Sequence, residues 1–166
     1  GPWAGCAGAR SSRGPAQVHV VALGADVRTV GVVPASTCAL APDGSFAAFL
    51  LEDRSGVTVL DLSNGKKTKL SIENLKITAA TFGPKGSTLY VTACAAKDAD
   101  RSDVFTFSVG LHGWEDANQI TNKPKFKVDP KPLPGARYIL YQTATQDPNA
   151  GGGRSRGRRF RRFRSR

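Results

Sequence analysis

The acidic residues that could take part in general acid–base chemistry lie beside predicted turns and strand ends and are not paired. Asp43, Asp61 and Asp103 are the clearest examples. Carboxylates at such positions commonly accept hydrogen bonds from nearby backbone N–H groups and so stabilise turns. Ser45 follows Asp43 and Gly44, but it lacks the G-x-S-x-G sequence that exposes a nucleophilic serine. We therefore predict no catalytic residues and no enzymatic activity.

The cysteines and histidines lack the spacing of a metal site. Cys6, Cys38 and Cys94 form no CxxC pair, and His19 and His112 lie apart from them. Zinc sites usually show such pairs, and a disulfide framework usually shows an even number of cysteines. We predict no metal and no cofactor. Cys38 and Cys94 lie in apolar, strand-like surroundings, so we expect them to be buried thiols, which fits a reducing compartment.

Two loops superficially resemble functional sequences. His112 stands beside Trp114 in a predicted loop, where we expect a solvated side chain. Residues 83–87, GPKGS, suggest a phosphate-binding loop, but the spacing and the following helix that such a loop requires are missing. We therefore interpret residues 83–87 as a hairpin turn.

Positive charge is concentrated at the carboxyl end. The net charge of the 166-residue chain is +11, and the last sixteen residues hold eight arginines and no acid, so the rest carries only +3. A flexible glycine-rich segment of this kind can displace counterions from phosphates, and its phenylalanines can stack on bases. We predict that it binds RNA or DNA with little sequence preference; the alternatives are a solubilising tail or a non-native extension. The residues assigned to nucleic-acid binding are Arg154, Arg156, Arg158, Arg159, Phe160, Arg161, Arg162, Phe163, Arg164 and Arg166.

The best-formed structural unit comprises residues 41–62. Pro42, Asp43 and Gly44 make a turn, and two β-rich runs follow, at 46–51 and 57–62, with a polar break between them. Asn64 and Gly65 then predict a type I′ hairpin turn, which requires positive φ at both residues. Further strands are predicted at 17–23, 27–33, 37–41, 68–72, 76–82, 87–94, 104–109, 126–128 and 137–143.

The order of strand, proline–glycine turn, strand, polar loop and strand occurs twice. The turns at Pro42 and Pro84 are 42 residues apart, a spacing typical of propeller blades. A third copy is predicted to turn at Pro134 and Gly135. The predicted fold is all-β, a partial WD40-like β-propeller of about two to three blades; a single antiparallel sandwich is the alternative.

Composition divides the chain into three parts. We predict a disordered segment at residues 1–16, a partial propeller at 17–146 and the basic tail at 147–166. No apolar run reaches the roughly 18 residues that a membrane-spanning helix needs. We expect a cytoplasmic protein with no membrane contact, and the absence of an initiator methionine suggests a fragment or a processed chain.

Residues 30–110 resemble the N-terminal part of the β-propeller in the eukaryotic translation initiation factor 2A family. The first copy of the pattern is Ala41-Pro42-Asp43-Gly44 followed by Val57-Thr58-Val59-Leu60-Asp61, and the second runs from Thr81 to Gly86 and continues with Leu89 and Thr92. The resemblance implies a non-catalytic platform that binds the small ribosomal subunit and assists delivery of initiator tRNA. It carries over no tRNA-contacting residue.

Two other functions stay open. One is a generic WD40-like or TolB-like scaffold that binds protein partners on the propeller surface and has no role with RNA. The other is the propeller part of a peptidase whose hydrolase domain lies elsewhere.

Overall fold

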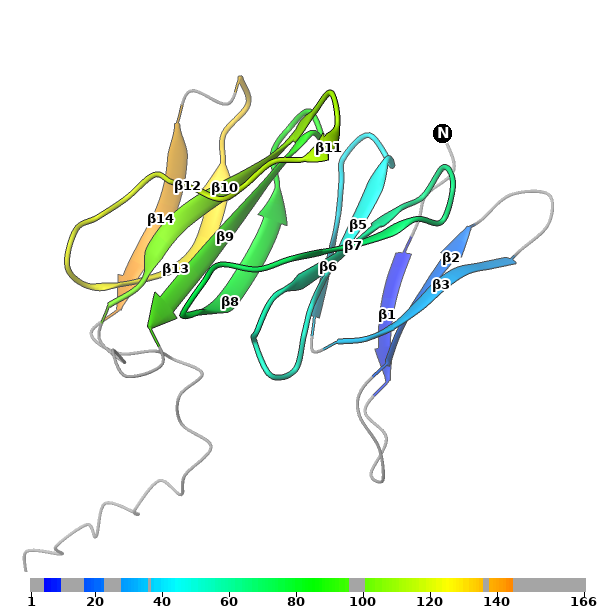
Figure 1. Cartoon of the computed structure of the whole chain (residues 1–166), viewed down its shortest axis with the longest axis horizontal. Coiled ribbons are helices and arrows are strands. Elements are labelled where there is room, and N and C mark those ends of the chain that lie inside the picture. Colours follow the sequence, from blue (N-terminus) through cyan, green and yellow to red (C-terminus); the bar gives the residue numbers. More distant parts are fainter. Residues whose placement is uncertain are drawn as a thin grey trace, which may run out of the picture.

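The structure is a computed structural model that describes residues 5–9, 17–22, 28–35, 37–95, 101–135 and 138–144, and its regular elements there are all β-strands (Figure 1). Every paired strand runs antiparallel to its neighbour. The strands form successive sheets that stand side by side in sequence order, from β1–β3 on the right of Figure 1 to β13 and β14 on the left.

Two sheets at the centre are the most complete. The first has the order β4 (Thr37–Leu40), β5 (Phe46–Leu50), β6 (Val57–Asp61) and β7 (Lys67–Leu70). The second has β8 (Leu75–Phe82), β9 (Thr88–Ala95) and β10 (Asp103–Gly110), with the short strands β11 (Gly113–Trp114) and β12 (Asn118–Gln119) both paired to β10.

A partial sheet lies on each side of these two. On the amino-terminal side it contains β1 (Gly5–Ala9), β2 (Gln17–Ala22) and β3 (Arg28–Pro34). On the carboxyl-terminal side it contains β13 (Phe126–Pro132) and β14 (Ile139–Ala144). The predicted all-β arrangement of propeller blades is confirmed, with two full blades between two partial ones.

The turn chemistry that marked the repeat is reproduced in the geometry. Gly44 and Gly86 have φ of 74° and 73°, a left-handed conformation that favours glycine. Their N–H groups donate to the carbonyls of Ala41 and Gly83, at 2.9 and 3.0 Å. Two turns 42 residues apart therefore have the same conformation and the same hydrogen bond.

The third predicted turn has a backbone hydrogen bond that also occurs in the other two turns, between the residues that flank the turn. The N–H of Leu133 donates to the carbonyl of Tyr138 at 3.0 Å, and Gly135 has a φ of 86°. The matching bonds of the other turns are Ala41 to Phe46 at 2.9 Å and Gly83 to Thr88 at 2.7 Å. The turn at Pro134 and Gly135 thus joins the first two strands of a third repeat, as predicted.

Apolar side chains fill the space between neighbouring sheets. Phe105 and Phe107 share one face of β10, as their alternation predicts, and both lie in the core between the two central sheets. Other members of this core are Ala48, Leu50, Val57, Val59, Ile77, Phe82, Leu89 and Val91. A second core, between the first two sheets, contains Val33, Ala35, Ala47, Phe49 and Leu60.

The structure differs from expectation in two places. β1 lies inside the segment predicted to be disordered, and its five residues pair with residues 17–21 of β2; the remainder of residues 1–16 lies outside the described residues. At the β6–β7 hairpin Gly65 has a φ of 75°, whereas Asn64 is not among the residues with positive φ. The turn is therefore not type I′, and Asn64 instead accepts a hydrogen bond from the N–H of Lys66 at 2.8 Å.

Within the described part of the chain we find no helix with the length and apolar character needed to cross a membrane.

Candidate functional site

A polar cluster joins the third and fourth sheets, and its centre is the side chain of Lys127. This residue follows Phe126 on β13, which packs against β8, β9 and β10, and only 1% of Lys127 is exposed. Burial of an ammonium group is costly unless it is paired and hydrogen-bonded. The residues around Lys127 therefore decide what the cluster can do.

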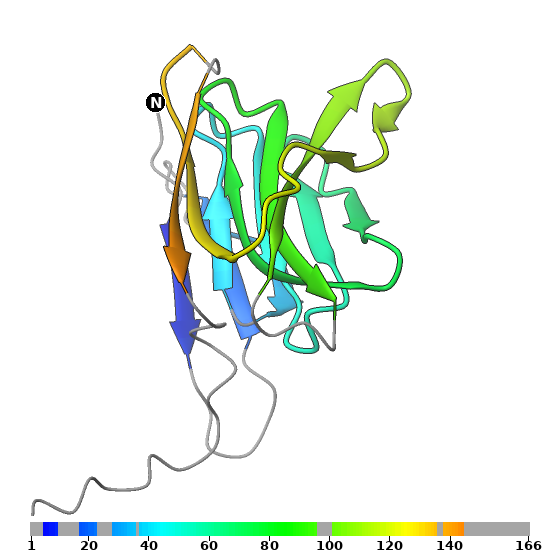
Figure 2. The same cartoon turned by 90° about the vertical axis from the view of Figure 1, so that its left-hand side faces the viewer.

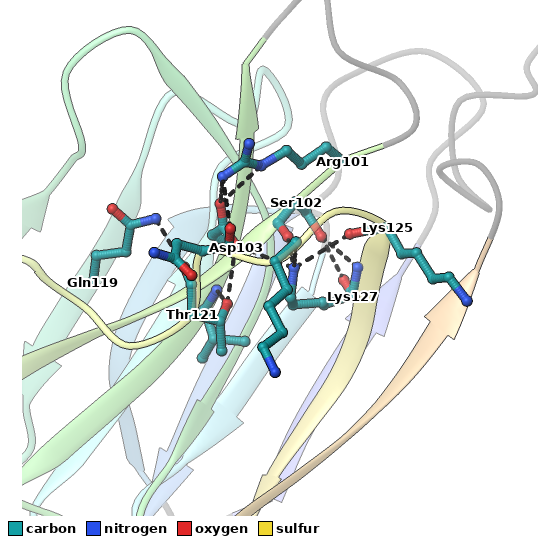
Figure 3. Close-up of polar contacts among 10 residues, drawn as sticks. Arg101, Ser102, Asp103, Gln119, Thr121, Lys125 and Lys127 are labelled. Atoms are coloured by element: carbon teal, nitrogen blue, oxygen red, sulfur yellow. Dashed lines mark hydrogen bonds and ion pairs between the residues drawn. The ribbon is translucent and has the colours of Figure 1, made fainter.

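Four oxygen atoms surround the Nζ atom of Lys127 (Figure 3). The carbonyls of Ser102 and Lys123 accept from it at 2.6 Å each, the carbonyl of Lys125 at 3.3 Å, and Oδ1 of Asp103 at 3.1 Å. An ammonium group has three N–H donors. All of its donors are thus engaged by oxygen acceptors.

Asp103, the first residue of β10, connects this ammonium to two further groups. Its Oδ2 accepts from the guanidinium of Arg101 at 3.1 Å, and its Oδ1 accepts from the hydroxyl of Thr121 at 3.1 Å. The N–H of Val104 in turn donates to Oγ1 of Thr121 at 2.9 Å. We predicted that Asp103 would stabilise a turn; it instead forms ion pairs with Arg101 and with Lys127.

Ser102 completes the cluster with two bonds to the same residue. Its hydroxyl donates to the carbonyl of Lys127 at 2.9 Å and accepts from the N–H of Lys127 at 2.6 Å. A nucleophilic serine needs a neighbouring base to take its proton, whereas this hydroxyl proton is bound to a carbonyl. The arrangement holds two sheets together and leaves no activated nucleophile on Ser102.

A cavity of about 260 Å³ opens beside the cluster. Its walls come from the ends of β8, β9 and β10. They include Arg101, Ser102 and Asp103 of the cluster, and also the buried residue Cys94. The lining residues are Leu75, Ala93, Cys94, Ala95, Arg101, Ser102, Asp103, Phe105 and Gln119.

Asp43 and Asp61 have the turn-stabilising role that the sequence predicted. Oδ1 of Asp43 accepts from the backbone N–H and the hydroxyl of Ser45, at 3.0 and 2.6 Å. Oδ1 of Asp61 accepts the same two groups of Ser63 at 2.9 and 2.6 Å, and its Oδ2 accepts from Asn64 at 2.9 Å. Ser45 is therefore part of a turn.

The hydroxyl of Ser63 and the other donors in this turn lower the pKa of Asp61 below its ordinary value of 3.8, against a smaller opposing effect of burial. A lowered folded-state pKa means that the charged carboxylate contributes stability above pH 3.8, and that this contribution is lost as the pH falls through the folded-state pKa. We expect Asp61→Asn to destabilise the protein at pH 7, with the difference from wild type shrinking below pH 3.8.

Urea unfolding at a series of pH values measures this difference. Asp116→Asn, at an exposed aspartate outside this turn, is the control for the loss of one negative charge. A pH-independent loss of stability in Asp61→Asn would contradict the prediction.

The other candidate residues have varied outcomes. His112 is exposed in the turn between β10 and β11, as predicted, and Cys94 is a buried thiol. The prediction for Cys38 is wrong, because this partly buried residue is disulfide-bonded. The cysteines therefore give no support to a reducing compartment. Among the described residues no group of three or more His, Cys, Asp and Glu side chains could hold a metal ion.

The arginines and phenylalanines assigned to nucleic-acid binding, between Arg154 and Arg166, lie outside the described residues. Conversely, sequence reasoning missed Lys127. The alternation of residues 126–128, FKV, places a lysine between two apolar residues, which is typical of a strand with a solvated face. The one signal in the sequence was Asp103, directly before the strand predicted at residues 104–109.

The solved structures to which the chain is similar include two TolB proteins. The putative TolB from Agrobacterium tumefaciens has a TM-score of 0.59 and 13% identity over 82% of this chain and 48% of that chain. TolB from Acinetobacter baumannii has a TM-score of 0.62 and 17% identity over 89% of this chain and 36% of that chain. The fold is that of β-propeller blades.

At such low identity the likeness shows the fold alone. The propeller blades span less than half the length of either TolB chain. No protein-family model matches the sequence, and no curated protein does. The structural neighbours therefore support a propeller and do not single out the translation initiation factor 2A family.

Proposed function

We propose that these propeller blades act as a non-catalytic binding platform for a macromolecular partner. The observation that carries the proposal is that the polar side chains of the candidate site form structural hydrogen bonds and ion pairs. Asp43 and Asp61 hold turns, and Ser102, Asp103 and Lys127 hold two sheets together. The reactive atoms of these five side chains are engaged in structural hydrogen bonds and ion pairs, and we infer that a partner is bound by the surfaces of the blades.

A second, more specific function is favoured by the composition of the tail. Eight arginines interleaved with Phe160 and Phe163 suit a single-stranded nucleic acid. Together with the resemblance of residues 30–110, this supports a translation-factor role in which the protein binds the small ribosomal subunit and assists initiator tRNA delivery.

The two functions respond differently to removal of residues 151–166. We expect the full chain to retain small ribosomal subunits from a lysate at low salt and to lose them at high salt, because phosphate contacts are salt-dependent. The tail-deleted chain should retain protein partners but not RNA. Quantitative protein and RNA analysis of the retained material measures both. Retention of neither by the full chain would contradict the platform, and salt-insensitive or absent RNA retention would contradict the translation-factor role.

A further inference from the structure

An open groove of about 510 Å³ lies between the outer part of the second sheet and the arm that carries β11. Figure 2 shows this arm projecting away from the sheets. We propose that the groove, together with the adjoining edge of β7, binds an extended peptide in which acidic and apolar residues alternate. This inference rests on the proposed binding-platform function and assigns its partner chemistry. The lining residues are Phe46, Val59, Asp61, Lys66, Lys67, Thr68, Lys69, Val109, His112, Gly113 and Trp114.

The floor of the groove is apolar and aromatic. The rings of Phe46 and Trp114 meet edge to face with their centroids 5.3 Å apart, and the ring of Phe82 lies 6.4 Å from each of them. Val59 lies beside them in the groove. The partly exposed surface of Trp114 and Phe46 is suited to an apolar side chain from a ligand.

The strand β7 beside the groove is rich in lysine. Lys66, Lys67 and Lys69 are all exposed, and all three line the groove. Among the described residues that line the groove, Asp61 is the one carboxylate, and its oxygens accept from Ser63 and Asn64. The lining thus has three lysines and one carboxylate, and this excess of positive charge favours an anionic partner.

The register of β7 determines how the charges and the apolar floor are arranged. Thr68 lies opposite Val59, so its side chain shares the face of Val59 that lines the groove. Lys67 and Lys69 alternate with Thr68 and lie on the other face. The edge of β7 thus has an apolar groove on one face and two lysines, about 7 Å apart, on the other.

An added β-strand matches this arrangement. β7 is the last strand of its sheet, and extended peptides bind proteins by pairing with such edges while alternate side chains enter pockets. Successive residues of the peptide would point in turn to the lysines and into the groove. A single-stranded RNA fits less well, because Phe46 and Trp114 pack against each other and against Phe82 instead of offering separate faces to bases.

The test uses the full chain and a short labelled peptide in which glutamate alternates with leucine. A peptide of the same composition, with its glutamates and leucines in separate blocks, is the ligand control. We expect the alternating peptide to bind more tightly by fluorescence anisotropy. The charge reversal Lys69→Glu should weaken its binding about fivefold, since an exposed ion pair contributes up to about 1 kcal/mol.

Lys85→Glu is the matched protein control, because Lys85 is exposed in a turn and does not line the groove. It makes the same change in net charge, so any binding of the peptide to the arginine tail is common to both variants. In a Trp3→Phe background Trp114 is the only remaining tryptophan, and its emission should shift when the peptide binds. Far-ultraviolet circular dichroism verifies that each variant is folded.

Equal binding by Lys69→Glu and Lys85→Glu, or an unchanged emission of Trp114, would overturn the groove assignment. So would an oligouridine that competes with the peptide and depends on Lys69 in the same way, because the occupant would then be a nucleic acid. If the wild-type chain retains macromolecular partners from a lysate but binds no peptide, the groove proposal alone fails.

Discussion

Lys127→Met should lower the free energy of unfolding by about 3–5 kcal/mol, the usual cost of removing one partner of a buried ion pair. Methionine can occupy much of the same space, so the loss comes chiefly from polar groups. The carbonyls of Ser102 and Lys123 each lose a hydrogen bond of 2.6 Å, and Oδ1 of Asp103 loses its ion pair in a site that is nearly closed to water. Thermal or urea unfolding measures the change.

Lys131→Met is the matched control on the same strand. Lys131 also pairs with an aspartate, Asp129 at 2.9 Å, but 66% and 53% of the two side chains are exposed. An exposed pair contributes no more than about 1 kcal/mol. A similar small loss in both variants would show that the buried cluster does not join the third and fourth sheets as we infer.

A double-mutant cycle with Asp103 tests the same interaction independently. If Lys127 and Asp103 stabilise each other, the losses in Lys127→Met and Asp103→Asn should add up to more than the loss in the double variant. The expected coupling lies within about 0.5–3 kcal/mol. Strictly additive losses would contradict the ion pair as a source of stability.

Gly86→Ala should destabilise the protein by about 2–4 kcal/mol, from two causes that act together. The φ of 73° is unfavourable for any residue with a Cβ atom. In addition, a Cβ atom on Gly86 would collide with the carboxylate of Asp43. This carboxylate cannot move away without losing its hydrogen bonds to Ser45.

Gly44→Ala separates the two causes. Gly44 has nearly the same φ, 74°, but a Cβ atom there would meet nothing within 4 Å. Urea unfolding should therefore show a loss of only about 1–2 kcal/mol for Gly44→Ala. Combining Gly86→Ala with Asp43→Ser, which shortens the side chain but keeps an acceptor, should recover part of the difference. Equal losses in the two alanine variants would mean that the contact between the turns does not constrain them.

Much of the fold could be predicted because local chemistry and global structure agree in the central sheets. Pro42 and Gly44 favour one turn between two β-rich runs, so the hairpin of β4 and β5 follows from neighbouring residues alone. The copy at Pro84 and Gly86 then indicates a repeat. Each sheet needs a neighbour on which to bury its faces, and the repeat predicts blades for that reason.

Features that depend on distant contacts could not be predicted in the same way. Lys127 has an ordinary strand sequence, and its burial arises from residues about 25 positions earlier in the chain. Asn64 and Gly65 are a second example, because the dipeptide favours a type I′ turn, whereas hydrogen bonds of the Asp61 and Asn64 side chains hold the loop in another conformation. β1 was missed because glycine and alanine carry almost no hydrophobic signal.

The groove was missed for a different reason. Its lysines lie on one hairpin and its tryptophan on another, more than forty positions away. Each element looked like an ordinary exposed loop or strand edge, and only the packing of the second sheet against the third brings them together.

The junctions between the sheets differ in chemistry, and cooling and heating should therefore affect them differently. The first two junctions have apolar cores, and apolar contacts weaken as the temperature falls. The junction at β10 and β13 includes the ion pair of Asp103 and Lys127, and the desolvation cost of such pairs falls as the temperature rises. A warm environment thus favours the contact of the fourth sheet with the third relative to the other two contacts.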